Sequence, residues 1–479
     1  MKLRPEDLKR IGKEIIDDIK FYRDVDNEFT IYAEIYLDGH TEFIEITSPK
    51  FAPYLRCRFR EETKSNDYFE YQPLLQRKKD ETILFGKKVK PYYRIAGNSK
   101  CIVYFLGDKL HQSVVIDKDG WNVCSQSRYK FLLRATTKEQ VVPIDGKDLI
   151  EVMKPYVNMD NKSFTLFIIY LVQCFFNSSS HFIAVISSQR GSGKSTITQM
   201  IQEIVDPSKA TKAILPTSEN DITNYFANNM LVAFDNTQKV KDNISDIFCS
   251  SVTGATVTKR KLYTDNEEFL VNLKNIIILN GIDIVPTKND LLERSLLFEL
   301  EKITPDKRKT EKDIWKNFKK DKPYILGAIF NTVSKALAIR RNLNLKETHR
   351  MSDAYTDMCA IALALDIPLD EFIKIFNENI AKLEQTRSEE NFFCNTIKDY
   401  LEKTRMSSLN DVSLNKECKV SDVFSAMKPL SSSEAKYFPK TASHFSRKLN
   451  EERNTLINLG YDFKIEKKKD ASYIEFFKI

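Results

Sequence analysis

One stretch near the middle of the chain constrains the fold more than any other: SSQRGSGKST, residues 187–196. It follows the apolar segment FIAVIS (182–187), which predicts a short buried strand, and it leads into KSTITQMIQEIV, which predicts a helix beginning at Lys194. Glycines at positions 191 and 193 allow consecutive backbone amides to turn inward and bind an anion. A strand, a glycine-rich loop and a helix in this order predict a phosphate-binding P-loop.

The residue types of this loop predict a site for ATP and Mg²⁺. Lys194 is expected to reach the β- and γ-phosphates, and Ser195 to hold Mg²⁺. Ser188 stands where a P-loop usually has its first glycine, which leaves open how tightly the chain enters the loop but not the cradle itself. The predicted cofactor-binding residues are Gln189, Arg190, Gly191, Ser192, Gly193, Lys194, Ser195 and Thr196.

Two later apolar segments end in polar residues. LVAF (231–234) predicts a strand beside the P-loop strand, and Asp235 at its end is predicted to bind the Mg²⁺ shell together with Ser195. NIIILN (275–280) predicts a strand next to Asp235, where Asn280 would orient the attacking water or sense the γ-phosphate; a strand-end asparagine making a turn is the alternative. The predicted catalytic residues are Lys194, Asp235, Asn236, Asn280 and Arg294.

The chain as a whole predicts an α/β fold with four domains. Residues 1–150 have alternating segments typical of strands, including a hairpin over 29–47 that turns at Asp38 and Gly39, and no catalytic constellation. Residues 151–300 alternate helices with short apolar strands, which predicts a mainly parallel sheet. Residues 301–390 have helical spacing, and 391–479 form a last domain.

The last domain has the order helix, helix, basic-tipped hairpin, which predicts a winged helix that binds DNA. Thr441 is the expected N-cap of a helix whose apolar face is Ala442, Phe445 and Leu449. His444, Arg447 and Lys448 lie off that face and are predicted to read base edges, and Lys467, Lys468 and Lys469 to hold the DNA backbone. A winged helix used for protein contacts is the alternative.

The order of these motifs resembles an AAA+ ATPase: Walker A, Walker B, sensor 1, arginine finger and a helical lid. The resemblance implies that Arg294 completes a neighbouring subunit's site, although a surface salt bridge is an alternative. Many AAA+ proteins have a glutamate as general base directly after the Walker B aspartate. Here that position is Asn236, so the base is either replaced by a water-positioning amide or supplied from elsewhere, with Glu219 and Asp221 as weak candidates.

The segment 253–275 narrows the resemblance to one group of AAA+ proteins. It predicts a β-hairpin with Lys259, Arg260 and Lys261 on its first strand, like the pore hairpin that grips single-stranded DNA in superfamily 3 and MCM-like helicases. A basic surface hairpin is the alternative. The stretches DN (235–236), TGATVTKRKLY, ILNGI, ERS and HRMSDA resemble the replication initiator–helicases of phage-related mobile elements, among them the Rep proteins of staphylococcal pathogenicity islands. This resemblance covers residues 150–390.

Two functions follow as expectations. The first is an ATP-dependent, hexameric replicative DNA helicase that also binds its own double-stranded origin as initiator and passes single-stranded DNA through a pore. The alternative is a DNA-binding AAA+ switch that assembles on DNA or recruits partners without unwinding. The charge of 74 basic against 67 acidic residues, a net +7, permits a polyanionic partner without requiring one.

Cysteine and apolar patterns indicate a cytoplasmic protein without a membrane partner. The eight cysteines have neither metal-ligand nor redox spacing, and the five histidines form no cluster in the sequence, so we expect neither a zinc site nor disulfides. The charged N-terminal segment does not resemble a signal peptide. The longest apolar run, 164–176, is too short for a membrane span and predicts a buried helix.

Overall fold

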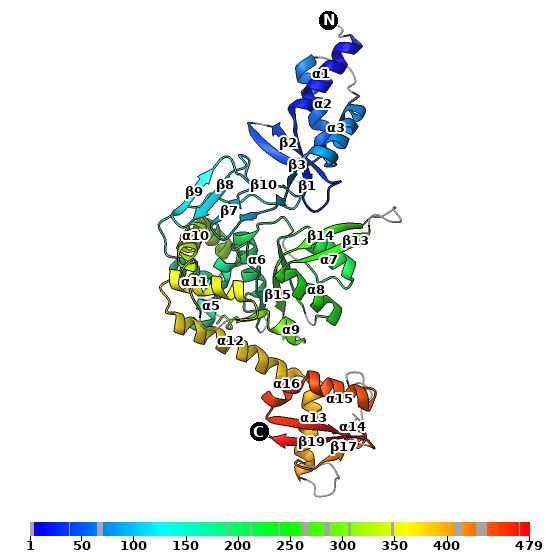
Figure 1. Cartoon of the computed structure of the whole chain (residues 1–479). Helices are drawn as coiled ribbons and strands as arrows, with labels where there is room; N and C mark the ends of the chain where they lie inside the picture. Colours follow the sequence, from blue (N-terminus) through cyan, green and yellow to red (C-terminus); the bar gives the residue numbers. More distant parts are fainter. Residues whose placement is uncertain are drawn as a thin grey trace. The chain divides into compact units, whose positions relative to one another are not determined.

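The computed structural model describes residues 4–37, 39–64, 70–188, 191–210, 213–237, 240–260, 268–281, 288–304, 308–345, 349–406, 414–427, 438–468 and 470–479. The chain forms two compact units, residues 1–284 with 298–375 and residues 285–297 with 376–479. Both combine helices with sheets, and the first contains a parallel sheet, so the fold is mixed α/β (Figure 1).

The first unit begins with a four-stranded sheet of order β3-β2-β1-β4 and three helices. The strands are β1 (Lys20–Asp24), β2 (Ile31–Leu37), β3 (His40–Glu45) and β4 (Lys87–Val89), and the helices are α1 (Pro5–Asp18), α2 (Phe51–Thr63) and α3 (Gln72–Phe85). The predicted hairpin is confirmed, because Leu37 pairs with His40 across its turn. The helices add to a segment that the sequence predicted to be strand-rich.

Antiparallel strands follow in the order β6-β7-β8-β9, and they pack against a long helix. They are β6 (Ile95–Gly97), β7 (Cys101–Phe105), β8 (Ser113–Asp117) and β9 (Gly120–Cys124), while β5 (Pro91–Tyr92) pairs with β10 (Lys130–Phe131). The helix is α10 (Glu311–Arg340), which contacts β8 and β9. Trp121 Nε1 donates a hydrogen bond of 2.8 Å to Asn331 Oδ1 of α10, so this sheet is joined to residues far away in the sequence.

The central sheet has the strand order β12-β15-β11-β16. Its strands are β11 (Ile183–Ser187), β12 (Leu231–Phe234), β15 (Ile276–Gly281) and β16 (Ser295–Glu299), and both β11 and β12 run parallel to β15. Residues of β11, β12 and β15 are buried, which explains their continuous apolar runs. The expectation that β12 lies beside β11 is wrong, because β15 separates the two strands.

Helices precede, connect and follow these strands in the sequence. They are α4 (Leu149–Met153) with a 3₁₀ turn (Lys154–Tyr156), α5 (Asn161–Gln173), α6 (Lys194–Val205), α7 (Glu219–Ala227), α8 (Asp242–Thr253) and α11 (Ser352–Ala364). The apolar run that predicted a buried helix is α5, whose residues from Leu166 to Val172 are almost completely inaccessible to solvent. No helix among the described residues combines the length and the apolar character that crossing a membrane requires.

A β-hairpin lies between β12 and β15 in the sequence. Strands β13 (Ala255–Arg260) and β14 (Glu268–Leu273) pair antiparallel, from Ala255 opposite Leu273 to Arg260 opposite Glu268, and the pair lies beside α7 in Figure 1. The predicted hairpin is therefore present. Its turn, with Lys261, lies outside the described residues, as do the side chains of Lys259 and Arg260.

The second unit has its own hydrophobic core. It contains α9 (Asn289–Leu292), the end of α12 (Leu369–Glu390), α13 (Phe392–Met406), α14 (Val420–Met427), α15 (Ala442–Glu451) and α16 (Arg453–Asn458). A three-stranded antiparallel sheet has the order β17-β19-β18, from β17 (Cys418–Lys419), β18 (Tyr461–Lys467) and β19 (Ser472–Lys478). Phe445 and Leu449 of α15 are buried in this core, and Thr441 caps the helix by accepting a hydrogen bond from the His444 amide, as predicted.

Candidate nucleotide-binding site

The glycine-rich loop connects β11 to α6, as the sequence predicts. Gly191 and Gly193 have φ angles of +82° and +88°. Residues other than glycine adopt this backbone region only with strain. Gly193 is the N-cap residue, and its carbonyl accepts the first helical hydrogen bond, 3.0 Å, from Ile197. The helix therefore begins directly at Lys194, which places its N-terminal amides at the loop. Gln189 and Arg190 lie outside the described residues.

Ser188 takes part in the loop rather than disturbing it. Lys194 Nζ donates a hydrogen bond to the carbonyl oxygen of Ser188, and the hydroxyl of Ser188 contacts that of Ser192, which is buried. The ammonium group is thereby held against the loop. The serine at the first motif position thus contacts two later residues of the motif.

A polar cluster forms where the strands end. Ser195 Oγ donates to Asp235 Oδ2 at 3.1 Å, and Asn280 Nδ2 donates to Asp235 Oδ1 at 2.9 Å. Asn280 is only 1% exposed. Because β12 and β15 are parallel neighbours, their carboxyl ends meet at one edge, and α6 brings Ser195 to the same edge. The structure thus brings together three residues that the sequence selected.

The donor set of this cluster fits Mg²⁺. A hydroxyl and a carboxylate supply oxygen ligands, and Mg²⁺ in nucleotide sites is usually held by few protein oxygens while water and phosphate provide the rest. Ser195 and Asp235 would hold the ion through these oxygens.

Thr198 is a member of the cluster that the sequence analysis missed. Its hydroxyl accepts a 3.2 Å hydrogen bond from Asn280 Nδ2 and donates one of 2.9 Å to the carbonyl oxygen of Lys194. Thr198 lies four residues after Lys194, one helical turn inward from the loop, and this spacing is the signal that could have identified it. The buried threonine fixes the position of the Asn280 amide.

Asn236 has an unusual backbone conformation. Its φ angle is +55°, its amide donates to Asp235 Oδ1 at 3.0 Å, and the residue is exposed. A pocket of about 300 Å³ adjoins this turn, lined by Ile214, Leu215, Pro216, Thr217, Asp235, Asn236, Thr237, Lys241 and Ile244. Positive φ values at residues other than glycine are found preferentially at functional sites.

The alternative bases do not line this pocket. Glu219 Oε1 accepts a 2.9 Å hydrogen bond from Asn243 Nδ2, and the amide of Asp221 binds the Ser218 hydroxyl at the start of α7. Among the described lining residues, Asp235 is the acidic one. These contacts give no support to Glu219 or Asp221 as the base.

Thr196 and Arg294 are the two predicted site residues that remain to be placed. Thr196 is half-buried in the first turn of α6. Arg294, in the second unit, forms an ion pair of 2.5 Å with Asp290 Oδ1 and donates to the Asp290 carbonyl at 2.7 Å. Its position thus agrees with the salt bridge named as the alternative, without testing the role in a neighbouring subunit.

Arg308 is a second residue that the sequence analysis missed. One of its guanidinium nitrogens lies 3.9 Å from the position that a Cβ atom would occupy on Gly191, and the side chain is exposed. A cation beside a glycine-rich loop can contribute to binding a polyphosphate. The sequence around Arg308 has no motif that indicates this proximity.

The predicted DNA-binding residues of the second unit are mostly at its surface. His444 is exposed, Arg447 is 3.6 Å from Glu451, and the Lys448 ammonium lies 5.0 Å from the centre of the Phe393 ring. Lys467 is exposed at the end of β18, and Lys468 pairs with Glu417 at 2.5 Å; Lys469 lies outside the described residues.

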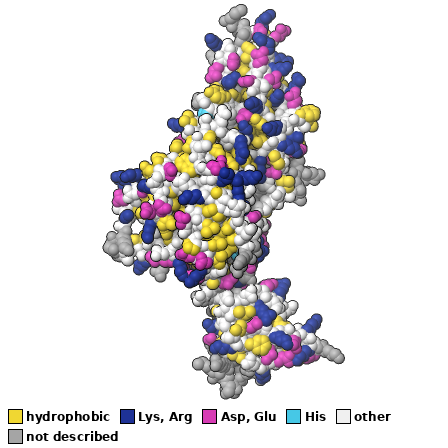
Figure 2. Space-filling view, turned by 60° about the vertical axis from the view of Figure 1, so that its left-hand side comes forward, with side chains coloured by type: hydrophobic (Ala, Val, Ile, Leu, Met, Phe, Trp, Pro, Cys, Tyr) yellow, Lys and Arg dark blue, Asp and Glu magenta, His cyan; other side chains and the backbone are white. Residues whose placement is uncertain are grey.

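On the face shown in Figure 2, surface charge does not single out one interface. Figure 2 shows Lys and Arg side chains spread over the face in view, with Asp and Glu side chains among them. This mixture agrees with the modest net charge of +7. A nucleic-acid interface therefore has to be argued from particular residues.

We predict that Asn280→Ala slows ATP hydrolysis by about 10- to 100-fold while ATP affinity stays within a few-fold, because the amide orients groups at the reacting end and carries little of the binding. Steady-state turnover and equilibrium binding of a labelled ATP analogue measure the two quantities. Equal losses in both would instead assign Asn280 to ground-state binding.

Comparison with known proteins bears on the central part of the chain. Residues 150–368 match the family model of the actinomycete integrative conjugative element replication protein, a match that spans less than half of the 479 residues. No curated protein matches the chain. The central region is therefore similar to replication proteins of mobile elements, which confirms that coarser part of the sequence resemblance. The identification with AAA+ helicases stays a prediction.

Two solved structures align with nearly the whole chain. One is described as the A form apo structure of the NrS-1 C-terminal region, with 11% identity, coverage of 98% of this chain and 99% of that chain, and a TM-score of 0.44. The other is the same form for residues 305–718 of that protein, with 12% identity, coverage of 98% of both chains and a TM-score of 0.40. TM-scores of this size do not establish a shared fold.

Proposed function

We propose that this chain is an ATP-driven replication protein of a mobile element that unwinds DNA and also binds its own origin. The observation that carries the proposal is the cluster of Ser195, Asp235 and Asn280 at the carboxyl edge of a parallel sheet, directly beside the glycine loop. Similarity of residues 150–368 to mobile-element replication proteins supports DNA as the substrate class. The motor is proposed to be an AAA+ core followed by a helical lid.

Each residue of the cluster has a distinct role in this proposal. The amides of the loop and Lys194 bind the phosphates, and Ser195 and Asp235 hold the Mg²⁺, which neutralises charge developing on the phosphoryl group. Asn280, fixed by Thr198, orients the attacking water. Asn236 has no carboxylate and cannot act as the general base, so its side-chain amide positions this water instead.

We further propose that the chain works as a ring, a hexamer in the family it resembles. Arg294 would leave Asp290 and bind the phosphates of a neighbouring subunit's nucleotide. One feature is compatible with such an exchange: Arg294 Nε is buried and has no hydrogen-bond partner within the described part of the chain. Double-stranded origin DNA would be bound by the second unit as a winged helix, through α15 and the β18–β19 hairpin.

Asn236 favours a second candidate function. A site without a carboxylate after Asp235 has a weaker means of activating water, and slow hydrolysis suits a switch whose ATP state controls assembly on DNA. The β13–β14 hairpin favours the first candidate, because a switch has no need for Lys259 and Lys261 in a pore.

A strand-displacement assay on forked DNA tests the proposal. We predict that the unaltered chain unwinds the fork with ATP and that Lys259→Ala with Lys261→Ala abolishes unwinding while origin binding persists, since these lysines would contact only strand phosphates. Lys100→Ala with Lys118→Ala removes the same charge from exposed positions outside the hairpin and serves as the matched control.

Origin recognition is measured in the same preparation by competition gel shift. His444→Ala with Arg447→Ala should remove sequence preference and leave fork unwinding intact, because both side chains belong to α15. Unaltered unwinding by the hairpin variant would reject the pore mechanism. ATP-dependent assembly on DNA without any strand displacement would establish the switch instead.

A further inference from the structure

Two histidines and a glutamate meet in the first unit, far from the nucleotide site in the sequence. His40 and Glu42 are two residues apart on β3 and therefore share a face of that strand, and His111 belongs to the loop between β7 and β8. Nε2 of His40 lies 3.1 Å from Glu42 Oε1, and Nε2 of His111 lies 4.0 Å from the same oxygen. The histidines form no cluster in the sequence, but folding brings His40 of β3 against His111 of this loop.

The three side chains are closely packed; Glu42 is buried and the two histidines are partly buried. Glu42 is 5% exposed, and the two imidazole rings stack with centroids 4.3 Å apart. The Nδ1 atom of His40 is buried without a hydrogen-bond partner in the described structure. His111 has a φ angle of +53°. Its ring and that of Phe105 form a T-shaped pair with centroids 5.6 Å apart. Such packing holds both rings in place beside the carboxylate.

We propose that His40, Glu42 and His111 form a binding site for a transition-metal ion of the Zn²⁺ type. One donor atom from each residue lies within 4.8 Å of the other two. Zn²⁺ bonds to imidazole nitrogen and carboxylate oxygen are about 2.0–2.2 Å, so tetrahedral ligands are about 3.4 Å apart. An ion would therefore draw His111 Nε2, which is 4.0 Å from Glu42 Oε1, inward, whereas His40 Nε2, at 3.1 Å, would move slightly away from this oxygen. Two nitrogens with one oxygen suit Zn²⁺ better than Mg²⁺, which prefers oxygen ligands.

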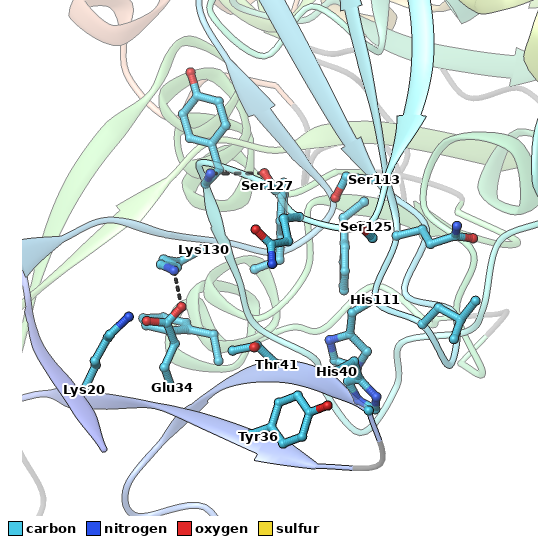
Figure 3. Close-up of a pocket in the computed structure, with 18 residues that line it drawn as sticks. Lys20, Glu34, Tyr36, His40, Thr41, His111, Ser113, Ser125, Ser127 and Lys130 are labelled. Carbon is cyan, nitrogen blue, oxygen red and sulfur yellow. Dashed lines mark hydrogen bonds and ion pairs between the residues drawn. The ribbon is translucent and has the colours of Figure 1, made fainter. Parts of the chain in front are cut away.

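The site opens into a pocket of about 480 Å³. Figure 3 shows His40 and His111 together on one side of it, with Lys20, Glu34 and Lys130 on the other side. Three protein ligands with a fourth position facing a pocket are the arrangement of zinc sites that bind water or a substrate, whereas purely structural sites are closed by four ligands. The fourth position would take water or a small oxygen-donor ligand.

Lys50 competes with the metal for Glu42. Its Nζ donates to Glu42 Oε1 at 2.6 Å and to Oε2 at 2.5 Å, and its side chain is 48% exposed. An ion bound by the carboxylate would displace this ammonium group, which can move into solvent. Removing the lysine charge should therefore strengthen metal binding, the opposite of what removing a ligand does.

Zinc titration of the full chain without an affinity tag tests the proposal. After treatment with a chelator, calorimetric titration with ZnCl₂ is expected to show one high-affinity site, and Co²⁺ to give the visible absorption of a tetrahedral ion. His40→Gln and His111→Asn should each weaken binding by at least about 100-fold, because even second-shell changes cost 10- to 100-fold. Asparagine tolerates the backbone of His111.

The test includes two control variants that should leave zinc affinity unchanged and one variant that should increase it. His444→Ala removes an exposed histidine and Asp235→Ala removes the nucleotide-site carboxylate, so both should bind zinc like the parent. Lys50→Met should bind zinc several-fold more tightly. Absence of a stoichiometric site, equal affinity in the histidine variants, or unchanged or weaker binding by folded Lys50→Met would each overturn the proposal. Circular dichroism establishes that each variant is folded.

Discussion

Lys194→Ala in the full chain is expected to abolish ATP hydrolysis, with a loss of at least about 100-fold in turnover, while the protein stays folded. The ammonium lies against the loop, bound to the Ser188 carbonyl oxygen, where it would stabilise the charge that spreads over the transferred phosphoryl oxygens. Alanine continues a helix well, so the structure of α6 should be kept. Phosphate release under saturating ATP and Mg²⁺ measures the loss.

Asp235→Ala should have an equally large effect by a different route. It removes the carboxylate that binds Ser195 Oγ and Asn280 Nδ2, and with it the predicted Mg²⁺ ligand. Lys100→Ala, at an exposed position outside the site, is the control for loss of a lysine. Turnover within a few-fold of the parent in either Lys194→Ala or Asp235→Ala would refute the assignment of the nucleotide site.

Arg94→Leu is expected to destabilise the first unit by about 3–5 kcal/mol. It removes the nearer of the two guanidinium groups that face the Asp206 carboxylate, the other being that of Arg134 at 3.8 Å, and it leaves buried carbonyl oxygens without their donor. Arg94 is completely buried, and its Nε lies 3.1 Å from Asp206 Oδ1. Its Nη atoms donate to carbonyl oxygens of Phe105, Leu106, Lys138 and Pro207. One guanidinium thus joins the segment before β6 to the residues that follow the nucleotide-site helix α6.

Neighbouring groups strengthen this connection. Gln140 Nε2 and the Tyr104 hydroxyl donate to the Ile204 carbonyl at 3.1 and 3.2 Å, which satisfies the C-terminal end of α6. Burial raises the pKa of Tyr104, so its hydroxyl keeps the proton that it donates. The N-terminal region therefore holds the end of α6 that is opposite the P-loop.

Denaturant unfolding measures the effect of Arg94→Leu, with Arg10→Ala as the control. Arg10 is 65% exposed in an i, i+4 ion pair with Glu14, so its loss should cost no more than about 0.5 kcal/mol. Comparable stabilities of the two variants would contradict the role given to the Arg94 network. Folded Arg94→Leu protein at low temperature should also show weaker ATP binding if α6 depends on this contact.

The elements that the sequence determined by itself are those with local signals. Two glycines between an apolar strand and a helix predicted the loop at Gly191 and Gly193, whose positive φ angles the structure confirms. Thr441 and the four-residue spacing of Phe445 and Leu449 predicted α15 in the same way. Each of these depends on neighbours within one or two turns of chain, which a sequence pattern contains directly.

Helices α2 and α3 could not be predicted from such a local pattern. Phe51, Leu55 and Phe59 have helical spacing and are buried, but charged residues surround them and the adjacent strands dominate the pattern. The apolar stripe is recognised as one face only once the sheet that it covers is known.

Tertiary structure alone decided which distant residues meet. The sequence selected Asp235 and Asn280, but the position of β15 between β12 and β11 depends on how the crossovers wind, which no local signal specifies. Arg94 with Asp206, and His40 with His111, come from segments that pair only after collapse into one unit. The physical reason is that these contacts join residues remote in sequence: local periodicity predicts which face of an element is buried, and only packing decides what lies against it.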